Sequence, residues 1–155
     1  RNDEAYTGAL AVYLVLKSII NKEWNGSNNL FEILIDQLPD TKLRDRLIQI
    51  NSLTENLTIA DIAKLGNDGY VVNSVSFAIY SATQVSKIGM KKVFEEIIHA
   101  GGDTDTNASI AGQLSGALLG IENIPAELIE KLTLMKEYEW MKGIIDKTRK
   151  RILFS

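Results

Sequence analysis

Two acidic residues lie close enough together, and beside the right hydroxyls, to hold a metal ion. A single residue lies between Asp103 and Asp105 in the stretch Gly101-Gly102-Asp103-Thr104-Asp105-Thr106-Asn107. Carboxylates this close repel each other unless something neutralises them. Hard oxygen ligands of this kind suit Mg²⁺, Ca²⁺ or Mn²⁺. The stretch therefore predicts a site for a hard divalent cation.

The same residues also have a purely structural interpretation. Asp and Thr are favoured at the start of helices, where their oxygens accept backbone N–H groups and carboxylates gain from the helix dipole. A helical pattern follows at once, carried by Ala108, Ile110, Ala111, Leu114, Ala117 and Leu118. Spacing alone leaves the metal and capping interpretations both open.

Two better-known acidic motifs do not fit. An EF-hand loop needs Gly at its sixth position and Glu at its twelfth, but counting from Asp103 these positions hold Ala108 and Leu114. An aspartyl-phosphate phosphatase would place Asp-x-Asp at the end of a buried strand, whereas here a helical pattern over residues 93–100 comes first. Neither motif explains the stretch.

The glycines around the acidic pair carry a structural prediction of their own. Gly101 and Gly102 can adopt backbone conformations that other residues avoid, which allows close approach to a ligand. Further on, Gly112, Gly116 and Gly120 are four residues apart, so one face of the predicted helix is nearly bare. Glycine inside a helix costs up to about 1 kcal/mol relative to alanine. We therefore expect another helix to pack closely there and to hold the carboxylates rigidly.

The elements that must position the acidic pair are helical. Apolar residues recur at helical spacing, and the strict alternation typical of strands is nearly absent. Pro39 and Gly66 are placed to end two of the helices. The pattern predicts helices over residues 5–20, 30–38, from 41, 58–65, 74–86, 90–100, from 104 and 136–151. The fold class is therefore all-α.

Composition narrows the classes of function. A chain of 155 residues, 45% of them hydrophobic, can form one core, so we expect a single domain over residues 1–155. The net charge of −3 with scattered basic residues argues against nucleic acid as a partner. No apolar run approaches the roughly 18–20 residues needed to cross a membrane. The lack of cysteine excludes disulfides and thiolate ligands and suits a reducing, cytoplasmic location.

The acidic stretch and its surroundings resemble the C-terminal signature of the ADP-ribosylglycohydrolase family, of the dinitrogenase reductase-activating glycohydrolase and ADP-ribosylhydrolase type. The residues that carry the resemblance are Gly101–Ala108, Ile110-Ala111-Gly112, Gly116–Gly120, Ile124-Pro125 and, further back, Leu65-Gly66-Asn67 and the helix over residues 75–80. Residues 1–64 look like the variable helical middle of the family. The resemblance implies a compact orthogonal helical bundle, of which this chain, opening on Arg1 rather than Met, would be the C-terminal part.

The resemblance also implies a ligand set. Asp103, Asp105 and Thr106 would bind a centre of two Mg²⁺ ions, with Mn²⁺ as an alternative; Asp105 would bridge the ions and the Thr106 hydroxyl would bind one of them. The family's remaining ligands come from an N-terminal Glu and a Thr-Asp-Asp cluster, which this chain lacks. The turn that borders ADP-ribose in the family corresponds to Asn67, Asp68, Gly69 and Tyr70. Many relatives have an acidic residue where this chain has Asn73.

The activity implied is removal of ADP-ribose from a modified protein side chain or a small ADP-ribose conjugate. A water oriented at the metal centre and activated by a carboxylate would cleave the bond to the ribose C1″. We expect the general base in a missing N-terminal part, so the chain alone would be inactive and a second chain is a candidate partner. The alternatives are a non-catalytic, crystallin-like or ADP-ribose-binding relative, and a hydrolase of another phosphate-containing substrate.

Three other residues invite functional roles but favour structural ones. His99, the only histidine, ends a predicted helix, where solvation or the helix dipole accounts for it. Trp24 and Trp140 are expected to be packing residues rather than stacking platforms.

Overall fold

The computed structural model describes residues 3–26, 29–53 and 57–153, and all regular elements in these ranges are helical. The predicted all-α fold class is therefore confirmed. The chain divides into two compact units, Arg1–Glu122 and Asn123–Ser155, and each is described by itself. Whether the chain acts as the single domain predicted from its length remains a prediction. No helix within the described ranges is long and apolar enough to cross a membrane.

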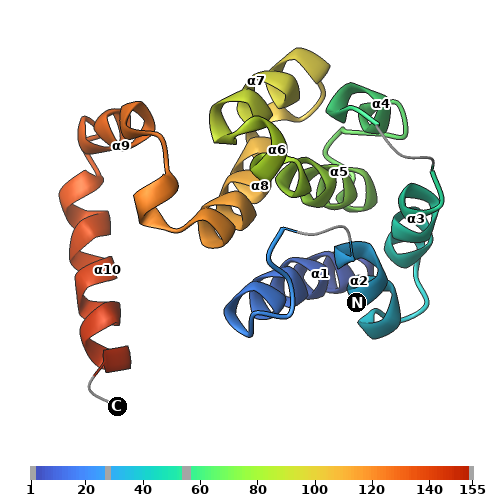
Figure 1. Ribbon diagram of the computed structural model, residues 1–155, viewed down its shortest axis with the longest axis horizontal. Coiled ribbons are helices and arrows are strands. Elements are labelled where there is room, and N and C mark those ends of the chain that lie inside the picture. Colours follow the sequence, from blue (N-terminus) through green and yellow to red (C-terminus); the bar gives the residue numbers. More distant parts are fainter. Residues whose placement is uncertain (1–2, 27–28, 54–56, 154–155) are drawn as a thin grey trace. The chain divides into compact units, whose positions relative to one another are not determined.

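The first unit, whose helices are labelled in Figure 1, holds the acidic stretch. Its helices are α1 (Asp3–Ile20), α2 (Leu30–Gln37), α3 (Lys42–Asn51), α4 (Ile59–Ala63), α5 (Val71–Thr83), α6 (Val85–Ile88), α7 (Met90–Ala100) and α8 (Thr104–Leu119). A single 3₁₀ turn, η1 (Ile121–Asn123), follows α8.

Helix α5 forms the centre of the first unit. It packs against α8, α1, α3 and α4, and it is buried along most of its length. A helix surrounded in this way needs small side chains, and any polar group on them must find a hydrogen-bond partner within the helix. The hydroxyls of Ser76 and Ser81 donate to the carbonyls of Val72 and Phe77, four residues back, at 2.6 and 2.8 Å. The serines therefore let neighbouring helices approach closely without leaving buried donors unpaired.

The start of α5 differs from the sequence prediction. The apolar pattern predicts a helix over residues 74–86, whereas α5 begins at Val71 and ends at Thr83, and the short α6 follows Gln84. The residue before α5, Tyr70, is extended, and its N–H donates to the Asp68 carboxylate at 3.0 Å. This side-chain hydrogen bond fixes the turn that precedes the helix. Hydrophobic periodicity contains no information about such a bond, so it does not predict where α5 begins.

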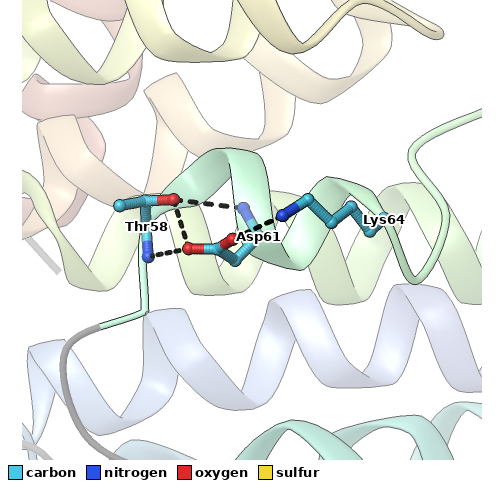
Figure 2. Close-up of polar contacts among 3 residues, drawn as sticks. All are labelled: Thr58, Asp61 and Lys64. Atoms are coloured by element: carbon cyan, nitrogen blue, oxygen red, sulfur yellow. Dashed lines mark hydrogen bonds and ion pairs between the residues drawn. The ribbon is translucent and has the colours of Figure 1, made fainter.

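Helix α4 is short and is held by its N-terminus (Figure 2). The Thr58 hydroxyl accepts the Asp61 N–H at 3.1 Å, while the Asp61 carboxylate accepts the Thr58 N–H at 3.1 Å and its hydroxyl at 2.6 Å. This reciprocal pair is a capping box, which satisfies donors that a helix end leaves free. Gly66 follows with φ +128°, and a side chain there would collide with Asn73. Helix α4 ends at Ala63, two residues before the end at Leu65 that the sequence predicts, and a turn over Lys64 and Leu65 leads to Gly66.

The glycine pattern in α8 has two different explanations. An added Cβ at Gly112 would lie 3.2 Å from the Phe94 ring, so the predicted close packing of another helix is confirmed there, with α7 as the partner. Gly120 caps the end of α8 with φ +72° and open space around it. The packing prediction is therefore wrong at Gly120, where backbone conformation is what requires glycine.

The second unit contains α9 (Ala126–Thr133) and α10 (Tyr138–Leu153). No side chain described in this unit is buried. Trp140 is 69% exposed, contrary to the packing role expected for it, whereas Trp24 in the first unit is 2% exposed and is a core residue as expected.

Candidate metal-binding site

The acidic pair lies where α7 ends and α8 begins. Gly101 and Gly102 connect the two helices with φ +71° and +74°, a backbone conformation that favours glycine. Gly102 is required for a second reason, because an added Cβ would lie 2.5 Å from the backbone oxygen of Asn67. The backbone conformation predicted for the two glycines is confirmed, and close approach to a ligand stays a prediction. They allow α8 to begin immediately beside the turn that contains Asn67.

Asp103 occupies the N-cap position of α8 but does not cap it. Its side chain accepts no hydrogen bond from the backbone N–H groups of the first turn. The carboxylate instead lies against Gly69, where an added Cβ would be 3.0 Å from Asp103 Oδ2. The capping interpretation is therefore wrong for Asp103, whose half-buried side chain is available for another role.

Asp105 is exposed in the first turn of α8, two residues after Asp103. A hydrogen bond from the Asp103 carboxyl lowers the pKa of Asp105, and the backbone N–H groups of Thr106 and of Asp105 itself act in the same direction. The start of the helix thus stabilises the Asp105 carboxylate, as the capping interpretation predicts. The Asp103 and Asp105 carboxyl groups are nevertheless close together in the chain, and neighbouring carboxylates repel each other unless something neutralises them.

The residues present fit part of a metal site. The Asp103 and Asp105 carboxylates and the Thr106 hydroxyl are hard oxygen donors, which Mg²⁺ prefers. Mg²⁺ favours six oxygen ligands, several of which are commonly waters. Within the described part of the chain, no group of three or more His, Cys, Asp and Glu side chains could hold an ion. The roles of Asp103, Asp105 and Thr106 as metal ligands remain a prediction.

The turn over residues 66–70 packs directly against the acidic stretch, although about 35 residues separate them in sequence. The Asn67 side chain donates to the backbone oxygens of Ala100 and Gly101 at 3.1 and 2.9 Å. In return, the Asn67 backbone oxygen accepts the Asp103 N–H at 3.0 Å and the Asn107 amide at 2.7 Å. The predicted metal ligands and the predicted substrate-contacting residues are therefore neighbours.

Asp68 is held by a short chain of hydrogen bonds that reaches α3. Its carboxylate accepts the amide of Asn73 and the N–H of Tyr70, both at 3.0 Å. The Asn73 amide, followed by the Tyr70 N–H and the charge of Arg46, lowers the pKa of Asp68. Arg46 Nη1 donates to Asn73 Oδ1 at 3.0 Å and to the Leu65 backbone oxygen at 2.6 Å. Asn73 thus links Arg46 to Asp68.

Tyr70 is held in place by Glu4 and Lys42, which come from earlier in the chain. A hydrogen bond with Glu4 in α1 raises the pKa of Tyr70 and lowers that of Glu4. Lys42 at the start of α3 lies 3.3 Å from the Glu4 carboxylate. Tyr70 is 40% exposed. The fold therefore orients this ring from α1 and α3 while leaving part of it open to solvent.

Sequence reasoning gave no role to two residues that organise this site. Asn107 is fully buried, and the signal for it is its place on the same helical face as Ala111 and Leu114. A polar residue on a buried face must find a partner. Arg46 carries no comparable signal, because its partners lie 19 and 27 residues away. His99 is exposed in the last turn of α7, as expected.

Comparison with known proteins places the chain in a family. The family model of the ADP-ribosylglycohydrolases matches residues 1–153, including the first 64 residues that motif inspection linked to the family only through their helical character. A curated protein, ADP-ribosylhydrolase ARH3 of Gallus gallus, is 25% identical over 174 aligned positions. The match covers 90% of this chain and 46% of that protein, so the chain spans about half the length of this relative. No solved structure gave a significant match. The chain belongs to the ADP-ribosylglycohydrolase family.

Proposed function

We propose that the complete protein is a Mg²⁺-dependent hydrolase that removes ADP-ribose from a modified protein side chain or a small ADP-ribose conjugate. This chain would be the C-terminal part of its catalytic domain. The observation that carries the proposal is the position of the Asp103 carboxylate against Gly69 in the turn over residues 66–70, with Asp105 in the adjoining first turn of α8. Membership of the family, and a relative that is itself an ADP-ribosylhydrolase, support the reaction class.

Asp103, Asp105 and Thr106 would hold the ions, two Mg²⁺ or alternatively Mn²⁺. When bound, such ions supply Lewis acidity and a water that ionises more easily. Asp103 and Asp105 contribute negative charge that the fold keeps concentrated at one point, because the loop and the helix start fix their backbones. A divalent cation would relieve the repulsion between the two side chains.

The turn beside the carboxylates would contact the ADP-ribose. Asp68 is exposed, and its lowered pKa keeps it ionised near neutral pH, so it can accept hydrogen bonds from ribose hydroxyls. Gly69 leaves space at the Asp103 carboxylate, and Tyr70 offers a partly exposed ring whose position is already fixed. Asn67 completes the predicted contact set, although both of its amide hydrogens are used within the protein.

The general base and the remaining metal ligands would come from outside this chain. The described residues offer no third acidic side chain at Asp103 and Asp105, so we propose that a further segment or a second chain completes the site. The same observation favours one alternative function: a relative that binds ADP-ribose, or only packs, without catalysing hydrolysis.

Substitution of Asp105 separates these functions. In the complete protein, Asp105→Ala should lower Mg²⁺-dependent hydrolysis of an ADP-ribosylated substrate by more than the roughly 10- to 100-fold typical of losing a residue that only supports a metal ligand. Asp45→Ala is the matched control, because Asp45 is likewise an exposed aspartate in the first turn of a helix. Circular dichroism should show an unchanged helical fold in both variants.

Two outcomes would contradict the hydrolase. Turnover that Asp105→Ala leaves unchanged would exclude the proposed site. Calorimetric titration of the chain, alone and with the missing part restored, tests binding directly. Failure of both forms to bind Mg²⁺ and ADP-ribose would favour the structural alternative.

A further inference from the structure

One buried amide near the site has an unusual hydrogen-bond arrangement. Asn107 lies in α8 one helical turn after Asp103, and its side chain is fully buried. Its Nδ2 donates to the Asn67 backbone oxygen at 2.7 Å, while its Oδ1 is buried with no hydrogen-bond partner in the described structure. Reversing the amide would place two acceptors together, so chemistry fixes this orientation. An unpaired buried acceptor is unfavourable and calls for an explanation.

The donor on the same side chain provides that explanation. The Asn67 backbone oxygen has two donors, Asn107 Nδ2 and the N–H of Asp103 at 3.0 Å. The Asn67 amide in turn donates to the backbone oxygens of Ala100 and Gly101. We call these four hydrogen bonds the Asn67–Asn107 clamp. They tie the turn and the acidic stretch together from both sides.

The clamp determines where the Asp103 backbone lies. The Asp103 N–H is bound to Asn67, and the Asp103 carbonyl accepts the Asn107 N–H at 3.0 Å. Its carboxylate then lies against Gly69, two residues after Asn67. Loss of either asparagine side chain would leave the packing of α5 against α8 in place. It would, however, remove some of the hydrogen bonds that hold the turn against the acidic stretch.

We propose that Asn107 and Asn67 are positioning residues that fix the Asp103 carboxylate for divalent-ion binding; this inference rests on the proposed function. For Asn67 it adds a role to the predicted contact with ADP-ribose, because both of its amide hydrogens already bind the protein. Residues that orient metal ligands typically change ion affinity about 10- to 100-fold when they are removed.

The clamp itself can be tested without any metal. Amide hydrogen exchange would be followed at Asp103 in Asn107→Leu, which keeps the volume but loses the donor, and in Asn67→Ala, which keeps the backbone oxygen. The Phe77 amide inside α5 reports global opening. Exchange at Asp103 should accelerate about tenfold more than at Phe77 in both variants. Unchanged exchange at Asp103 in these folded variants would overturn the inference.

Ion affinity tests the positioning role. Binding of Mn²⁺ would be measured by electron paramagnetic resonance for the chain and for the complete protein, in the same variants. Affinity should fall about 10- to 100-fold. Ser115→Ala is the matched control, because Ser115 is also buried in α8 with an unpaired oxygen, two helical turns beyond Asn107. It should bind Mn²⁺ as the wild type does.

Hydrogen exchange and Mn²⁺ affinity together distinguish a failure of this inference from a failure of the proposed function. If exchange at Asp103 accelerates while Mn²⁺ affinity stays at the wild-type value, the clamp is structural only and the positioning role is wrong. If the wild type binds no Mn²⁺ in either form, the proposed function fails and the positioning role fails with it, while exchange still reports whether the clamp exists.

Discussion

At the residue scale, the site depends on the lack of a side chain at Gly69 as well as on the Asp103 and Asp105 carboxylates. Gly69 does not have a left-handed backbone, so conformation does not require glycine there. Glycine is favoured there because an added Cβ would lie only 3.0 Å from the Asp103 carboxylate. Such a contact is tighter than packed side chains normally adopt, so an added methyl group must displace the carboxylate. Gly69 therefore sets how closely Asp103 approaches the turn.

We predict that Gly69→Ala weakens divalent-ion binding about tenfold, because it moves Asp103, while the free energy of unfolding changes by less than about 1 kcal/mol. Calorimetry with Mg²⁺ and urea denaturation measure the two quantities. Gly143→Ala is the control, since Gly143 also lacks a left-handed backbone and has open space around it. Equal ion affinity in the two variants would show that Gly69 does not set the Asp103 position.

At the element scale, the stability of the short helix α4 depends on the hydrogen bonds at its N-terminus. Helix α4 packs against α7, whose C-terminus leads into the acidic stretch, and against α5. Five residues cannot form a stable helix by themselves. The capping box and the bond from Lys64 to Asp61 at 2.7 Å supply the missing support (Figure 2). Cap chemistry thus contributes to holding α7 in place.

This support should depend on pH. The Lys64 hydrogen bond, followed by the Thr58 hydroxyl and N–H, lowers the pKa of Asp61 well below its ordinary value of 3.8. A carboxylate whose pKa is lower in the folded than in the unfolded chain stabilises the fold above the ordinary value. That contribution is lost as the pH falls through the folded pKa. Asp61→Asn should therefore be less stable than the wild type at pH 7, and the difference should shrink in acid.

Thermal melts of the wild type and Asp61→Asn from pH 7 down to pH 2 measure this difference. Asp36→Asn serves as the comparison, because Asp36 is an aspartate near the end of α2, outside the capping box. A difference between wild type and Asp61→Asn that stays constant with pH would mean that the Asp61 charge does not contribute.

At the scale of the whole molecule, the core belongs to the first unit. All buried side chains lie between Thr7 and Ser115 in the described residues. They come from α1 to α8 and from the connection that contains Trp24. Asp103, Asp105, Thr106 and the turn over residues 66–70 also lie within this unit. Folding and the candidate site should therefore depend on the same part of the chain.

We predict that a chain ending at Glu122 folds without residues 123–155. Its melting temperature should fall by less than about 4 °C, which corresponds to roughly 1 kcal/mol for a domain of this size. Calorimetry measures the change, and the helical signal at 222 nm should decrease only by the share of α9 and α10. A chain ending at Ala100, which loses α8, is the control and should not fold. Failure of the longer chain to fold would mean that the second unit supplies essential packing.

The sequence by itself determined the all-α class, the need for glycine at Gly66, Gly101 and Gly102, and the acidic pair. These features follow from local rules: helical periodicity, backbone conformation and the chemistry of neighbouring side chains. Only the tertiary structure decided that Asp103 does not cap α8, and that Asn107 holds the turn at Asn67. It also decided that Arg46 supports Asp68 through Asn73. The contacts of Asn107 with Asn67 and of Arg46 with Asn73 join residues 40 and 27 positions apart, and they form only when helix packing brings the segments together, which no local pattern records.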